Sequence, residues 1–131
     1  MRFVKRLTVT AGSLESAPST QTVRLIKGTL THIDVGFRSG CAWMVSVVIL
    51  DRNLQVAPAN PEYSFVDDDH TMSFSMNYPI TDEPYELTLN GWSPDANYDH
   101  VITFRFDVDT QDGDDREILL AAMADPFKPY G

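Results

Sequence analysis

The residues with the clearest potential for chemistry are aspartates close to the end of the chain. Asp107, Asp109, Asp112 and Asp114 place carboxylates at short intervals around Gly113. Calcium takes about six to eight oxygen ligands, which a carboxylate-rich turn can supply. The spacing differs from that of an EF-hand, because the glycine comes one residue late when Asp107 is taken as the first ligand. We therefore expect a solvated turn, with a calcium site as the weaker alternative.

The histidines and the single cysteine do not indicate a metal or catalytic site. His32, His70 and His100 lie far apart in the chain, without the short spacing typical of zinc ligands. Cys41 has no histidine near it in sequence and opens an apolar stretch, where cysteine usually packs as a small hydrophobic residue. Phosphate-binding glycine loops and nucleophile-elbow motifs are also missing. We therefore expect no enzymatic activity and no cofactor.

Aromatic residues near predicted turns form another candidate site. Trp92 and Tyr98 flank a turn-rich segment, and Tyr63 and Tyr78 lie in or near other loops. Aromatic rings offer flat apolar surfaces of fixed geometry, on which a sugar can stack. Such rings more often close the end of a protein core. Carbohydrate binding through Trp92 and Tyr98 is therefore an alternative prediction.

The elements that must position these residues are predicted to be β-strands. Apolar and polar residues alternate most clearly in segments 29–37, 72–76 and 101–108. Segment 42–50 is apolar at nearly every position, which predicts a central strand covered on both faces, with Trp43 in the core. About seven to eight such segments, separated by turns, predict an all-β fold. The expected architecture is an antiparallel β-sandwich of jelly-roll type.

The 131 residues are predicted to form a single domain. Residues 1–21 are expected to form an N-terminal strand or arm, and residues 22–109 the sandwich core. Residues 110–131 would form a C-terminal segment that contains a short helix or tail. The aromatic residues Phe127 and Tyr130 in this tail are candidates for contact with a partner.

Charge is distributed unevenly along this acidic chain. The net charge is −9, with +4 in residues 1–52 and −13 in the remainder. The sequence pI of about 4.5 argues against nucleic-acid binding, which needs a basic face. Arg2, Lys5 and Arg6 at the basic end are candidate partner-binding residues. The most apolar stretch is too short for a membrane helix, and the first residues lack the apolar core of a signal peptide.

Several segments, in their order along the chain, resemble small all-β proteins encoded among the structural genes of tailed bacteriophages. The similarity lies within residues 22–108 and is carried by segments 40–49, 55–61, 85–89, 92–95 and 98–102. It implies a structural virion protein, made in the host cytoplasm, that decorates or cements the capsid without covalent bonds. Its partners would be the major capsid protein and further copies of itself, for example in a homotrimer. A carbohydrate-binding adhesion module and a calcium-dependent structural module remain alternatives.

Overall fold

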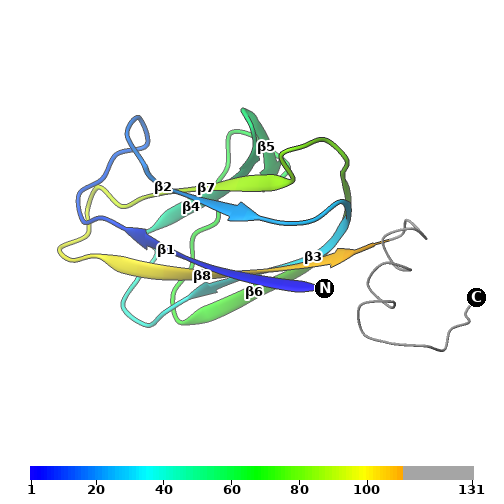
Figure 1. The fold of residues 1–131 in the computed structure, drawn as a ribbon. Coiled ribbons are helices and arrows are strands. Elements are labelled where there is room, and N and C mark those ends of the chain that lie inside the picture. The colour runs from blue at the N-terminus through cyan, green and yellow to red at the C-terminus, as the bar shows by residue number, and fades with distance from the viewer. Residues whose placement is uncertain (111–131) are drawn as a thin grey trace, which may run out of the picture.

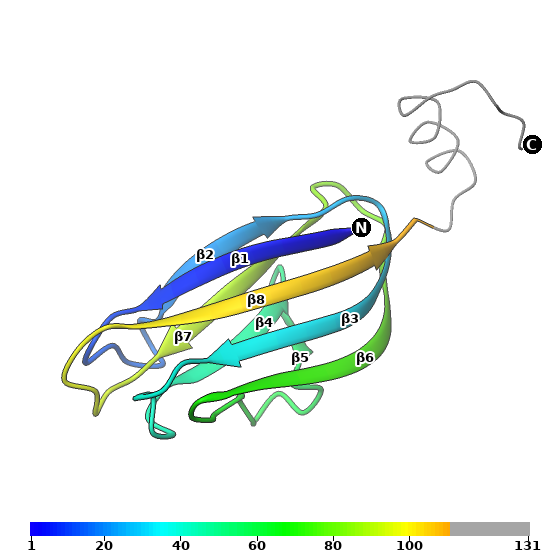
Figure 2. The ribbon, with the colours of Figure 1, turned by 90° about the horizontal axis from the view of Figure 1, so that it is seen from below.

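A computed structural model describes residues 1–110, which form two antiparallel four-stranded sheets packed face to face (Figures 1 and 2). The first sheet has the order β1 (Arg2–Val9), β8 (His100–Asp109), β3 (Gly28–Phe37) and β6 (His70–Ile80). The second sheet has the order β2 (Ser19–Arg24), β7 (Glu86–Trp92), β4 (Ser46–Asp51) and β5 (Leu54–Ala57). The prediction of an all-β sandwich is therefore confirmed.

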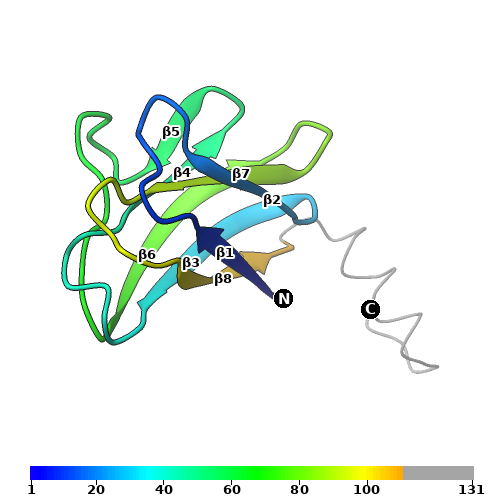
Figure 3. The ribbon, with the colours of Figure 1, turned by 90° about the vertical axis from the view of Figure 1, so that its left-hand side faces the viewer.

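Most connections in the chain cross from one sheet to the other. Within residues 1–110, only the turn between β4 and β5 joins neighbouring strands of the same sheet. The N-terminal segment belongs to this framework, because β1 pairs with β8 along its whole length, from Arg2 opposite Asp107 to Val9 opposite His100. The loops that follow β1, β3, β5 and β7 lie together at one end of the sandwich, which faces the viewer in Figure 3. We call this the loop end.

The core is formed by the inward-facing side chains of both sheets, as the alternation predicts. On β8, alternate residues from Ile102 to Val108 are buried, and Phe104 and Phe106 are fully enclosed. The neighbouring strand β3 places Val35 opposite Phe104 and Ile33 opposite Phe106. The second sheet supplies its own buried residues from the facing side: Val23, Val47, Ile49, Leu87 and Leu89.

The predicted strand over residues 42–50 is shorter in the structure, and the prediction that Trp43 lies in the core is wrong. The strand β4 begins at Ser46, and Trp43 lies in the preceding loop with 66% of its surface exposed. Ala42 and Trp43 have φ angles of 47° and 57°, in the left-handed region, which an extended strand does not use. Within β4, residues Val47, Val48 and Ile49 are all buried, so this part is covered on both faces as predicted.

The edge of the second sheet reflects the prolines of the sequence. The proline-containing segment 54–63 contributes only the four-residue edge strand β5, because proline lacks the backbone donor that a central strand needs. The predicted C-terminal helix and the aromatic tail lie outside the described residues. Within residues 1–110, no helix has the length and apolar character needed to cross a membrane.

Replacement of Phe104 by alanine should lower the free energy of unfolding by about 3–5 kcal/mol, because it leaves a cavity in the closed core. The matched variant Trp43→Ala should change it by no more than about 0.5 kcal/mol, because Trp43 is exposed. Urea unfolding of both variants measures the difference. An equal loss of stability in the two variants would contradict the packing described here.

Candidate functional site

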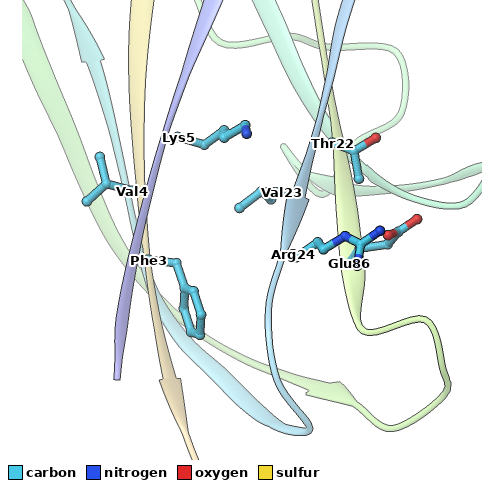
Figure 4. Close-up of a pocket in the computed structure, with 7 residues that line it drawn as sticks. All are labelled: Phe3, Val4, Lys5, Thr22, Val23, Arg24 and Glu86. Carbon is cyan, nitrogen blue, oxygen red and sulfur yellow. The ribbon is translucent and has the colours of Figure 1, made fainter.

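A groove opens between β1 and β2, the edge strands on one side of the sandwich (Figure 4). The groove has a volume of about 570 Å³. Phe3 and Lys5 line it from β1, Val23 and Arg24 from β2, and Glu86 from β7. The side chains of Phe3, Lys5 and Val23 point into the space between the two strands, whereas Arg24 points away from β1, toward Glu86, its partner on β7 (Figure 4).

The groove forms because the two sheets approach each other closely at only one end of β1. Near the loop end, the inward residues Leu7 and Val9 are buried against Gly91 of β7. A Cβ atom at Gly91 would lie 2.7 Å from Val9 Cγ2, so only glycine permits this approach. Toward the N-terminus, the inward positions are occupied by Phe3 and Lys5, which line the groove instead.

Basic residues are concentrated on this side of an acidic chain. Among residues 1–110, five of the eight lysines and arginines lie in β1, in β2 or in the turn after β2: Arg2, Lys5, Arg6, Arg24 and Lys27. The structure therefore places the candidate residue Lys5 on the same side of the sandwich as Arg24, which the sequence alone did not single out. Only the basic character of residues 1–52 pointed to it, because its position depends on the pairing of β2 with β7.

Arg2 and Arg6, the other cationic candidates in β1, face the outer side of the first sheet. Arg2 Nε donates a hydrogen bond of 2.8 Å to Asp107 Oδ1, and Arg2 Nη2 donates one of 3.2 Å to Oδ2. Arg2 Nη2 also lies 4.0 Å from Asp34 Oδ2, and Asp34 Oδ1 lies 2.8 Å from His32 Nε2. A row of charged and polar side chains therefore crosses β1, β8 and β3.

Asp107, one of the four proposed calcium ligands, belongs to this row and is bound by Arg2. Hydrogen bonding from Arg2 lowers the pKa of Asp107 below its ordinary value of 3.8. The stabilising contribution is therefore present above about pH 4 and is lost as the pH falls through the lowered pKa. Asp109 ends β8, whereas Asp112 and Asp114 lie outside the described residues. Within 1–110, no three acidic, histidine or cysteine side chains form a group suited to a metal ion.

At the loop end, the fold brings together a cysteine and a histidine that are distant in sequence. Cys41 Sγ lies 3.8 Å from His100 Nδ1, and the ring of Tyr98 packs on His100 with a centroid distance of 4.7 Å. Cys41 is fully buried and His100 is only 5% exposed. Burial raises the pKa of the Cys41 thiol, which favours the neutral form over the nucleophilic thiolate. Cys41 thus packs as a small hydrophobic residue within the Tyr98 and His100 cluster.

The exposed Trp43 is held in place by a carboxylate from another loop. Asp68 Oδ1 accepts hydrogen bonds from the backbone N–H groups of Gly40, at 3.0 Å, and Ala42, at 2.7 Å. Asp67 and Asp68 are themselves half-buried, whereas Asp69 is exposed. These bonds support the left-handed backbone at Ala42 and Trp43, a conformation that is costly for residues with a side chain.

The two proposed sugar-binding residues occupy different environments. Tyr98 is 59% exposed at the loop end, next to Gly40, where a Cβ atom would lie 3.1 Å from Tyr98 Oη. Trp92 is half-buried at the end of β7, opposite Ser46 of β4. Trp43 therefore replaces Trp92 as the exposed tryptophan at the loop end. The sequence pattern could not predict the exposure of Trp43, because the apolar segment 42–50 was assigned to a central strand.

Comparison with known proteins does not place the chain in a family. No protein-family model matches the chain. No curated protein matches it either. The remaining candidate sites, Phe127 and Tyr130, lie outside the described residues.

Replacement of Asp68 by alanine should destabilise the protein by about 1–3 kcal/mol, because the N–H groups of Gly40 and Ala42 lose their acceptor. Asp68→Asn keeps an acceptor oxygen and should cost less. Urea unfolding measures stability, and the rate of tryptic cleavage after the exposed Arg38 reports on the loop. Equal cleavage rates in the wild type and Asp68→Ala would show that Asp68 does not hold this loop.

Proposed function

We propose that this protein is a structural component of a virus particle, a decoration or cement protein that binds the capsid surface non-covalently through the side formed by β1 and β2. The observation that carries the proposal is the groove in which Lys5 lies beside the apolar ring of Phe3, with Arg24 on the outer face of the neighbouring strand β2. A basic binding side on a chain of net charge −9 would orient the protein on an acidic shell. The acidic remainder would then face away from the shell.

The topology supports a jelly roll as the finer description of the sandwich. The strand orders β1-β8-β3-β6 and β2-β7-β4-β5, with nearly every connection crossing between the sheets, are typical of eight strands folded as two Greek keys. Jelly rolls are common in viral capsid domains and in lectins. The fold is therefore in keeping with a virion protein, although this support is an analogy between folds.

Binding in the groove would combine two contributions. Burial of the ring of Phe3, which is only half-buried in the free protein, would provide affinity, because it removes apolar surface from water. The cationic groups of Lys5 and Arg24 would accelerate association with an acidic surface and select for it. Further contacts between copies of the chain would multiply these weak contacts over the shell.

Reversal of charge in the groove should weaken capsid binding. Arg24→Glu should raise the dissociation constant about tenfold or more, because it puts a carboxylate beside Glu86 and opposite an acidic partner. Arg38→Glu makes the same change of charge at the loop end and should leave binding nearly unchanged. Co-sedimentation with purified capsids of the encoding virus gives the dissociation constants. Equal binding by Arg24→Glu and the wild type would refute docking through the groove.

A second candidate function, carbohydrate binding, is favoured by the two exposed rings of Trp43 and Tyr98 at the loop end. Trp43 sits on strained backbone that Asp68 supports, and such strain is often found at binding sites. On a glycan array, Trp43→Ala should abolish a signal that the matched variant Trp92→Phe retains. Absence of any signal from the wild-type protein would eliminate this candidate.

A further inference from the structure

The strand β6 forms an unusually unprotected edge of the first sheet. It is the longest strand, with eleven residues, and it lies at the outside of its sheet (Figure 2). Within residues 1–110, no other strand pairs with its outer side. The ten residues from Thr71 to Ile80 include no aspartate, glutamate, lysine, arginine or histidine. The outer backbone groups of β6 are therefore available to another strand.

The other three edge strands carry the features by which proteins usually prevent such pairing. β1 contains Arg2, Lys5 and Arg6, and β2 ends in Arg24. β5 is only four residues long. Charged residues and short length both discourage the addition of a further strand. On β6, Pro79 removes one hydrogen-bond donor near the end of the strand, and the pairing with β3 shifts by one residue between Ser75 and Tyr78.

The side chains of β6 also leave apolar surface to be covered. Met72, Phe74, Met76 and Tyr78 face inward but are only half-buried. Their neighbours on β3 are fully buried: Val35 lies opposite Met72 and Ile33 lies opposite Phe74. The alternate residues Thr71, Ser73, Ser75 and Asn77 are exposed on the outer face. A strand added at this edge would therefore cover an apolar row on one face and meet small polar residues on the other.

We propose that β6 pairs in antiparallel fashion with β6 of a second copy of this chain, across a twofold axis. A second copy fits because the edge has no charges to repel its own image, although each chain has a net charge of −9. Two first sheets of four strands then become one continuous sheet. The interface is isologous, because the same strand is used by both copies.

The register of this pairing follows from the two faces of the strand. Residues directly opposite each other share a face, so inward residues must meet inward residues. Full overlap of His70–Ile80 with its copy puts Ser75 opposite Ser75 of the second chain. The inward residue Phe74 then meets Met76, and Met72 meets Tyr78, so that aromatic rings and thioethers contact each other.

A single cysteine substitution tests this register in the full chain. Opposite residues in an antiparallel pair have Cα atoms about 4.5–5.5 Å apart, within the range of a disulfide. Under mild oxidation with glutathione, Ser75→Cys should therefore give a covalent dimer. Ser73→Cys is the matched control, because its copy would lie four positions along the strand, roughly 13 Å away. The native Cys41 is buried and does not compete. Equal cross-linking of both variants, or none, would overturn the register.

The molar mass of the protein in solution, without capsids, tests whether the β6–β6 interface forms. Light scattering after size-exclusion chromatography should give a dimer, whereas a monomer at all concentrations or a trimer would refute the proposal. Ser75→Lys puts two ammonium groups opposite each other and should raise the dimer dissociation constant at least tenfold. Gln21→Lys adds the same charge to the exposed edge strand β2 and should leave the dimer intact. The inference is independent of capsid binding, because every measurement is made without capsids.

Discussion

The packing of the inward row of β8 against the second sheet is the interaction on which the rest of the structure depends. β8 lies between β1 and β3, so its position determines where both neighbours run. Phe104 and Phe106 are completely enclosed and stack with nearly parallel rings whose centroids are 6.3 Å apart. The apolar surface that they remove from water offsets much of the entropy lost when distant parts of the chain are brought together.

Sequence alternation predicted the strands and their inward faces well, because burial on one face imposes a period of two residues. The inward residues from Ile102 to Val108 are those that the pattern indicates. The pattern failed for Trp43, because apolar residues that surround a left-handed turn are indistinguishable from a buried strand. Arg24 and the contact between Cys41 and His100 could not be predicted, because they depend on pairing between distant segments.

The framework presents three different surfaces that need not compete with one another. The groove beside Lys5 and Arg24 lies on the side of β1 and β2, whereas β6 forms the opposite edge of the first sheet. Trp43 and Tyr98 belong to the loops after β3 and β7, at the loop end. A pair of copies joined through β6 would keep both grooves and both loop ends accessible. Such a pair could hold a surface at two points, which raises apparent affinity without any new contact.

Amide hydrogen exchange on the free and the capsid-bound protein tests most directly whether attachment uses the β1 and β2 side. The account predicts that binding adds protection in Arg2–Val9 and Ser19–Arg24, while the central strands β3 and β8 are protected equally in both states. Added protection confined to the loop end, around Trp43 and Tyr98, with none in β1 or β2, would contradict it.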